Sequence, residues 1–373
     1  MRDLKIGSGL VLIFVMLLIA GIGCTNYQIP GKGGSGPIVN NCEICHTDLE
    51  RLVEVHTPDT AAPVKGYGVE APHYEPYDRV FLGGTGYDSF KESGHYPVGC
   101  TGCHNGDSDT EEKDLAHAGD FISHPSMFYE DKCATCHPAI TVNFTTSIHN
   151  GTGMKRMVAM RSGASEFDDL PQHQIDGYNN NCAICHGTCG NCHVVRPPMG
   201  GGGLAEGHNF NYTPDMTNVC ITCHASTVGH AFQGVDSLGT VPDVHMTLND
   251  YDCLSCHDGL ELHGDGQPVE QRYAYSELPT CEDCHGENAA HPMDPDSIFH
   301  SRHADDLQCQ VCHSQDYNNC GSCHIDGEDA RIPAYMGFKI ADNPLPDLKS
   351  YSFTVVRRTT TAPDNWKIGR AHV

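Results

Sequence analysis

A five-residue pattern, Cys-x-x-Cys-His, occurs ten times in this chain of 373 residues and uses 20 of its 21 cysteines. The paired cysteines are Cys42 and Cys45, Cys100 and Cys103, Cys133 and Cys136, Cys182 and Cys185, Cys189 and Cys192, Cys220 and Cys223, Cys253 and Cys256, Cys281 and Cys284, Cys309 and Cys312, and Cys320 and Cys323. The histidines that complete the motifs are His46, His104, His137, His186, His193, His224, His257, His285, His313 and His324. Only Cys24 is left over, so no disulfide framework of the kind usual in cysteine-rich exported chains is expected.

A Cys-x-x-Cys pair whose second cysteine is directly followed by histidine is the attachment site of haem c. The two thiols add to the haem vinyl groups, and the histidine binds the iron of the same haem. Zinc is the alternative ligand for cysteine and histidine, but zinc would require the motifs to combine into four-ligand sets. Zinc binding also does not explain why a histidine directly follows the second cysteine of every motif. The sequence therefore predicts ten or more covalently bound haem c groups.

The composition agrees with an interior that is completed by bound apolar groups. Hydrophobic residues make up 39% of the chain, which also contains 40 glycines and 22 prolines. A chain this polar has little side-chain material for a core of its own size. We expect a mostly irregular fold with short α-helices packed around haems and little β-structure. The exception is a C-terminal strand or hairpin, where Tyr351, Phe353 and Val355 alternate with polar residues.

The second axial position of each iron decides what the haems can do. Fifteen histidines lie outside the motifs, and excluding His372 leaves enough for histidine on both faces of every iron. The expected distal ligands are His73, His95, His117, His124, His149, His208, His245, His263, His300 and His303. We expect His56, His173, His230 and His291 to lie at the surface or contact haem propionates. Irons with two histidines are saturated and exchange electrons, and the absence of methionine ligation favours low potentials.

The N-terminus reads as an export signal. Residues 1–23 contain the apolar stretch Leu10 to Ile22, which is shorter than the roughly 18 to 20 residues of a membrane-spanning helix. The stretch ends in Gly23-Cys24, which resembles a bacterial lipoprotein cleavage site, so we expect lipid attachment at Cys24. An uncleaved anchor helix and a free thiol are the alternatives. Residues 24–41 would then be a flexible tether of an exported lipoprotein, in the periplasm or at the outer membrane or cell surface.

The spacing of the motifs suggests two modules of five haems each. The first module spans residues 42–199 and ends near the closely spaced motifs at Cys182 and Cys189. The second spans residues 200–325 and ends with the motifs at Cys309 and Cys320. Residues 326–367 form a C-terminal segment that we expect to continue in the natural protein. Residues 368–373 match a translated sequencing adaptor and are interpreted as an artefact, His372 included.

Through these ten motifs, residues 42–324 resemble the multihaem c-type cytochromes, cytochrome c3-like and decahaem types, of metal- and sulfur-respiring bacteria. The resemblance implies bis-histidine haems, a haem chain and respiratory electron transfer. Its partners would be other redox proteins or cytochromes, or an extracellular metal or other terminal acceptor. Similar scaffolds host enzymes that convert nitrite, hydroxylamine or tetrathionate at one open or lysine-bound iron. Every motif here ends in histidine, so we expect an electron carrier rather than such a reductase, with a filament-forming subunit as a further alternative. The formal charge of -26 argues against nucleic acid as a partner.

Overall fold

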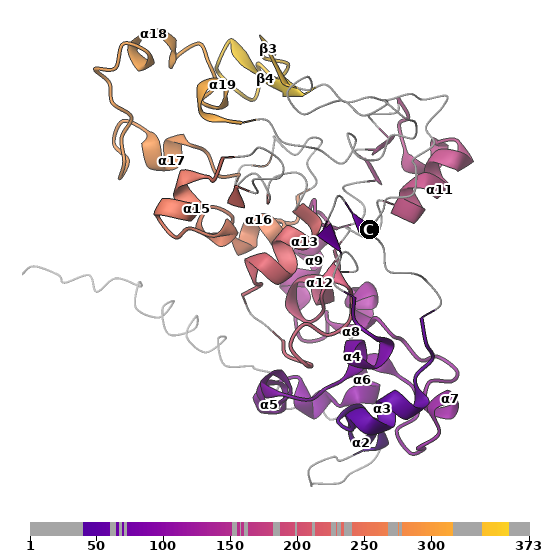
Figure 1. Ribbon diagram of the computed structural model, residues 1–373. Coiled ribbons are helices and arrows are strands. Elements are labelled where there is room, and N and C mark those ends of the chain that lie inside the picture. The colour runs from indigo at the N-terminus through magenta and orange to yellow at the C-terminus, as the bar shows by residue number, and fades with distance from the viewer. Residues whose placement is uncertain are drawn as a thin grey trace, which may run out of the picture.

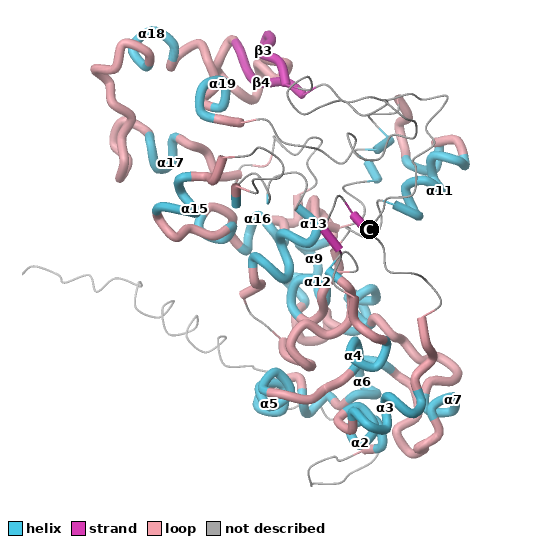
Figure 2. Tube along the Cα trace, in the orientation of Figure 1, coloured by secondary structure: helices cyan, strands magenta, loops and turns pink. Residues whose placement is uncertain are grey.

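Short helices joined by irregular loops make up most of the protein in the computed structural model (Figures 1 and 2). The structure describes residues 40–59, 65–66, 69–70, 73–150, 155–156, 158–159, 163–181, 187–197, 200–210, 213–224, 229, 233–234, 241–267, 275, 278–315 and 338–357. Cys24, the motifs at Cys182 and Cys320, His230 and His372 lie outside these residues. The remaining eight motifs and all ten expected distal histidines lie within them.

The longest of the described helices, α11, has ten residues. The α-helices are α2 (Asn41–His46), α3 (Leu49–Val55), α4 (Pro76–Val80), α5 (Thr85–Glu92), α6 (Cys100–His104), α7 (Lys113–Ala116), α8 (Tyr129–Lys132), α9 (Pro138–Phe144), α11 (Gln172–Asn181), α12 (Cys189–His193), α13 (Ile221–His224), α15 (Val244–Leu248), α16 (Gly259–His263), α17 (Glu282–His285), α18 (His300–His303) and α19 (Gln310–His313). The 3-10 turns η1 (Tyr96–Val98), η2 (Pro125–Phe128), η3 (Phe167–Asp169) and η9 (Cys253–Ser255) and the π-turn η6 (Met216–Cys220) complete the helical structure.

Many of these helices are the motifs themselves. Helices α6 and α12 coincide with complete Cys-x-x-Cys-His sequences, α2 contains a complete one, and α17 and α19 contain all but the first cysteine of one. Local capping defines where several begin. The Asn40 side chain accepts a hydrogen bond from the Glu43 N–H at 2.9 Å, and Thr188 and Asn191 form a capping box on α12. These caps satisfy N–H groups that the first helical turn leaves free.

The predicted C-terminal hairpin is present. Strand β3 (Phe338–Asp342) pairs antiparallel with β4 (Phe353–Arg357), with Ile340 opposite Val355. The other sheet in the described residues joins the two-residue strands β1 (Lys65–Gly66) and β2 (Val69–Glu70). The side chain that β4 buries is Thr354 rather than an apolar neighbour, because its hydroxyl contacts the Gln308 side chain. The predicted fold class, short helices and irregular chain with little β-structure, is confirmed.

Side chains alone form two small cores in the described residues. One gathers Val158, Phe167, Leu170 and Tyr178 around α11. The other gathers Leu82, Tyr87 and Phe90 with partly buried aromatic neighbours beside α5. Elsewhere large apolar side chains lie open, such as Leu248 at 76% and Phe299 at 72% exposure. This is the distribution that the composition predicts for a chain whose interior is completed by bound groups.

The helices follow one another through space largely in chain order (Figure 1). Helices α2 to α7 gather at one end, α8, α9, α12 and α13 lie in the middle, and α18, α19 and the hairpin lie at the other end. Residues 204–210 are an exception, because they fold back to the end of the molecule that holds α2 to α7. There the Leu204 N–H donates to the Arg79 carbonyl at 2.8 Å. None of the described helices has both the length and the apolar character required to cross a membrane.

Gly207 permits this return. It has a φ of +61°, and a Cβ there would lie 3.0 Å from the Gly83 carbonyl oxygen and 3.1 Å from the Tyr87 nitrogen. Glycine adopts such a left-handed backbone readily, and its lack of a Cβ allows this close approach. The next residue is His208, so this contact decides where His208 lies.

Candidate haem-binding sites

Seven pairs of imidazole rings recur in the structure with nearly the same separation. Each joins a motif histidine to a histidine outside the motifs. The ring centroids are 6.1 Å apart for His46–His117, 6.2 Å for His104–His208, 6.0 Å for His137–His95, 6.1 Å for His193–His263, 6.2 Å for His224–His149, 6.0 Å for His285–His245 and 6.1 Å for His313–His300. All seven non-motif histidines belong to the ten that the sequence proposes as distal ligands.

This separation matches two imidazoles that share one metal ion. An imidazole nitrogen binds a transition metal at about 2.0–2.1 Å, so two rings on opposite sides of one ion have centroids about 6 Å apart. Direct ring packing spans a wider range of centroid distances, from 3.9 Å for His95–Phe210 to 6.2 Å for His104–Phe121. The angle between paired rings varies from 16° to 75°, so no common stacking geometry explains the constant spacing. The residues therefore fit an iron bound between them.

Backbone carbonyls orient five of these rings. The Nδ1 atoms lie within hydrogen-bond distance of a carbonyl oxygen in His46 (Val80, 3.1 Å), His104 (Ile122, 2.8 Å), His117 (Lys113, 2.7 Å), His285 (His291, 2.8 Å) and His300 (Asp294, 3.0 Å). A carbonyl oxygen can only accept, so Nδ1 must carry the proton. Nε2 is then left with its lone pair, which is the form that binds a metal.

A recurring backbone contact holds three motif histidines in place. The Leu82 N–H donates to the His46 carbonyl at 2.8 Å, and the Ile122 N–H donates to the His104 carbonyl at 2.8 Å. The Met293 N–H donates to the His285 carbonyl at 3.0 Å. In each case the same passing segment accepts the Nδ1 proton. A later stretch of chain thus fixes both the backbone and the ring of the motif histidine.

Helix α7 brings His117 opposite His46. The Lys113 ammonium donates to the Val55 carbonyl and the Thr57 hydroxyl, both at 3.0 Å, which ties α7 to the end of α3. His117 follows α7 directly and packs edge-on against Phe121, with centroids 4.6 Å apart.

Burial keeps several of these imidazoles neutral. Desolvation lowers the pKa of His208 to about 4 and also lowers the pKa values of His46, His104 and His95. A histidine must be neutral to bind a metal through nitrogen, so this environment favours the ligating form.

The cysteines show that successive motifs lie against one another. A hydrogen bond to the first thiol of the next described motif raises the pKa of Cys42, Cys133 and Cys220, whose partners are Cys100, Cys189 and Cys253. Burial, the charge of Glu282 and then Cys281 raise the pKa of Cys309 to about 12. The sixteen described motif cysteines form no disulfide.

The remaining neighbours complete the sequence of motifs. Burial, followed by the charge of the adjacent thiol, raises the pKa of Cys103 beside Cys133. The same holds for Cys192, with a pKa of about 11, beside Cys223, and for Cys256 beside Cys284. The eight described motifs therefore form a row that follows chain order, in which the motif at Cys133 lies against that at Cys189, and the motif at Cys182 falls outside the described residues.

His257 differs from the other motif histidines. Its Nδ1 lies 2.7 Å from the carboxylate of Glu261, whose side chain is only 5% exposed, and this contact raises the pKa of His257. Among the eight motif histidines that the structure describes, it alone has no second imidazole at the recurring spacing within the described residues.

Three proposed distal ligands are not brought opposite a motif histidine by the described contacts. His73 lies 3.5 Å from a Glu75 carboxylate oxygen, His124 precedes η2 and His303 ends α18. Their ligand role stays a prediction, as do the roles of His186, His324 and Cys24 outside the described residues. Of the spare histidines, His56 donates to the Val53 carbonyl, His173 is exposed, and the ring of His291 lies 6.3 Å from His285. The Nδ1 atom of His285 faces the His291 backbone, which leaves its Nε2 for His245.

Sequence reasoning missed the groups that orient the ligands. Carbonyl acceptors such as Val80 and Ile122 have no signature, because every residue carries one. Glu261 could have been found, since it follows His257 by four positions at a helix start capped by Asp258. In the described residues no three His, Cys, Asp or Glu side chains gather as a metal-binding group, so they form no four-ligand zinc set.

Comparison with known proteins identifies part of the chain. Residues 262–314 match the model of the family described as cytochrome c554 and c-prime. This segment contains the motifs at Cys281 and Cys309 together with His263 and His300. No curated protein and no solved structure matches the chain. The match supports a c-type cytochrome, a protein that holds haem covalently and transfers electrons.

Proposed function

We propose that this chain is a multihaem electron-transfer cytochrome with ten or more haems, most of them bound by histidine on both faces. The recurring imidazole pairs are the observation that carries this proposal, because their spacing fits one iron between each pair. Haem supplies an iron that cycles between the ferric and ferrous states. The ligands of the seven described pairs are His46 and His117, His104 and His208, His137 and His95, His193 and His263, His224 and His149, His285 and His245, and His313 and His300.

Two histidines on each iron favour a carrier over an enzyme. If one iron were bound between the imidazoles of each of the seven pairs, both histidines would bind it and no position would remain for a substrate. A reductase would need one open site. That alternative is therefore the weaker proposal for these seven sites. A filament built on ligands shared between subunits is unnecessary for these pairs, since one chain supplies both members.

The row of motifs supports transfer along the molecule. Thiols of neighbouring motifs touch at Cys42 and Cys100, and again at Cys220 and Cys253. Haems attached to such neighbours would lie close together. Each transfer oxidises one ferrous iron as it reduces the next ferric iron, so no further reactant is needed.

We further propose that the protein works outside the cytoplasmic membrane, in the periplasm or at the outer cell surface. The export signal at residues 1–23 and the candidate lipid site at Cys24 support this location. Its role would be in anaerobic or extracellular respiration. The proposed partners are other redox proteins and an extracellular metal or other terminal acceptor. The charge of -26 disfavours nucleic acid.

Intact-mass measurement tests the haem proposal. The protein would be expressed in a host that exports it and attaches haem c, then denatured to remove anything held non-covalently. We expect the mass of the chain plus ten haems. A mass that corresponds to the chain without haem would contradict the proposal.

A further inference from the structure

Glu261 is a buried carboxylate held against a candidate haem ligand. Its Oε2 atom lies 2.7 Å from Nδ1 of His257, and its side chain is 5% exposed. Helix α16 begins directly after the motif and is capped by Asp258, which accepts from the Glu261 N–H at 2.8 Å. The first helical turn therefore directs Glu261 back towards His257.

The C-terminal end of α16 is also fixed in place. The Ser147 hydroxyl donates to the Leu262 carbonyl at 2.7 Å, and α16 packs against α9. His263, at the end of the same helix, faces His193. Glu261 thus lies on a short helix that is anchored at both ends, and its carboxylate has little freedom to leave His257.

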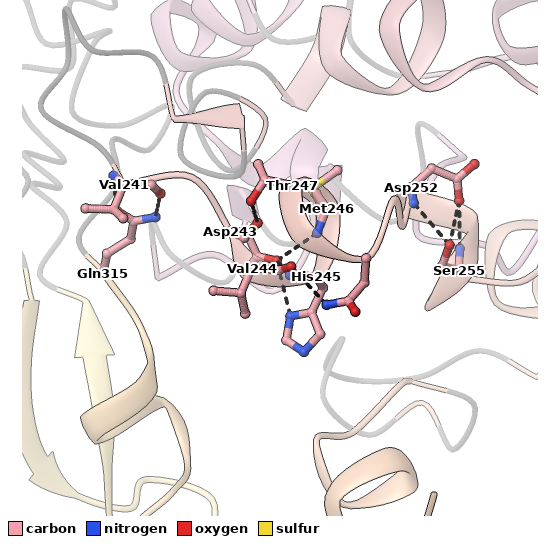
Figure 3. A network of polar contacts seen from close by, with 10 residues as sticks. Val241, Asp243, Val244, His245, Met246, Thr247, Asp252, Ser255 and Gln315 are labelled. Carbon is pink, nitrogen blue, oxygen red and sulfur yellow. Dashed lines mark hydrogen bonds and ion pairs between the residues drawn. The ribbon is translucent and has the colours of Figure 1, made fainter. Parts of the chain in front are cut away.

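Three other motif histidines have a neutral acceptor in the place of this carboxylate. His46, His104 and His285 donate Nδ1–H to neutral backbone carbonyls. The nearest comparison is His245, whose Nδ1 lies 3.1 Å from Asp243 (Figure 3). Asp243 is 25% exposed and His245 49%, and the same Asp243 oxygen also accepts from two N–H groups at the start of α15. The charge of Asp243 is therefore shared and screened by solvent, whereas the charge of Glu261 is not.

A buried carboxylate next to an axial imidazole changes the electron affinity of the iron. By accepting the Nδ1 proton strongly, it makes the imidazole a better donor, and its negative charge favours the iron state with the greater positive charge. Both effects stabilise ferric over ferrous iron. A neutral carbonyl gives the first effect weakly and lacks the second.

We propose that Glu261 is a positioning residue that lowers the reduction potential of the haem attached through Cys253, Cys256 and His257, below haems whose ligands donate to carbonyls. This inference rests on the proposed function and deepens it. The motif lies between those at Cys220 and Cys281, so the low-potential haem would stand inside the row. An electron entering it from a neighbour moves uphill, oxidising the neighbouring ferrous iron as it reduces this ferric one. The site would then slow passage between the two ends.

The test compares Glu261→Gln with Asp243→Asn in the full haem-loaded protein. Each substitution removes one charge and keeps a hydrogen-bond acceptor, and asparagine preserves the cap of α15. Difference redox titrations followed by absorbance would be recorded for both. In Glu261→Gln we expect one component to move to higher potential, with about a tenfold change in its ferric-to-ferrous ratio, which is about 59 mV for one electron. In Asp243→Asn the corresponding shift should be much smaller.

The inference fails if Glu261→Gln leaves every component in place, or if both variants shift equally. Glu261→Asp provides a second variant that keeps the charge, and its titration should stay nearer to the parent than that of Glu261→Gln. Intact mass separates this failure from failure of the proposed function. A full haem count with no shift removes only the role of Glu261, whereas a chain without haem removes the proposed function itself.

Discussion

At the scale of single residues, the choice of Nδ1 acceptor separates the candidate ligands into two kinds. Five donate to a carbonyl oxygen, as His104 does to Ile122, and this fixes the tautomer without adding charge. His257 donates to a buried carboxylate instead. The same imidazole can thus bind iron at different potentials, according to what accepts its second proton.

His117 offers a direct test of a distal ligand. It is exposed, and its ring faces the motif histidine His46. In His117→Gly we expect one iron per chain to lose its sixth ligand and become high-spin, because in the described residues no other imidazole lies opposite His46 at this spacing. Added imidazole should enter the exposed space and restore the low-spin state. Absorbance and electron paramagnetic resonance of the purified protein measure both changes.

His56→Gly is the matched control. His56 lies at the same end of the molecule, and its Nδ1 also donates to a carbonyl, that of Val53 at 2.7 Å. Its ring packs against Tyr77 rather than a motif histidine. This variant should remain fully low-spin. If it gains high-spin haem and His117→Gly does not, the ligand assignment at this site is wrong.

At the scale of helices and loops, the sequence predicted the individual helices and strands better than the contacts between segments far apart in the chain. The motifs indicated short helices and the alternation near Phe353 indicated a strand, because both are local patterns. The non-motif histidines could be counted, and their surplus indicated histidine on both faces of the irons. That His208 faces His104 could not be read from the sequence, since it depends on the return of residues 204–210 to the first end of the molecule.

Gly207→Ala tests that return. A side chain there meets two penalties, a left-handed backbone that costs about 1–2 kcal/mol and a close approach to the Gly83 carbonyl. We expect a lower thermal unfolding temperature together with high-spin character at the iron bound by His104, because His208 is displaced. Thermal unfolding and low-temperature absorbance measure the two effects.

Gly119→Ala separates the two penalties. Gly119 has a φ of +71°, but no atom lies within 4 Å of the added Cβ. The Gly119→Ala variant should therefore show only the strain of the left-handed backbone, with a smaller loss of stability than Gly207→Ala and no change in spin state. Equal unfolding temperatures and unchanged spectra in both variants would show that residues 204–210 do not position His208.

At the scale of the whole molecule, the paired histidines join segments far apart in the sequence. Three pairs, His104–His208, His149–His224 and His193–His263, cross the predicted boundary between residues 199 and 200. The two five-haem modules stay a prediction. If haem occupies these pairs, each iron links one module to the other. Haem attachment and folding of the central region would then depend on each other.

Membrane attachment is a separate prediction for the whole protein. Cys24 lies outside the described residues, and it is the one cysteine that no haem motif uses. We expect Cys24→Ser to release the exported protein from the membrane fraction, because the lipid acceptor is lost. Fractionation followed by haem staining measures this. Retention of the variant in membranes would point to an uncleaved apolar helix instead.

The central claim is that each recurring histidine pair holds one haem iron from both sides. Near-infrared magnetic circular dichroism of the oxidised full-length protein tests it most directly, because the charge-transfer band of ferric haem depends on the identity of both axial ligands. Normalised to the haem content per chain, the intensity should correspond to at least seven bis-histidine haems. Fewer than seven, with the balance in high-spin or histidine–methionine haem, would contradict the account.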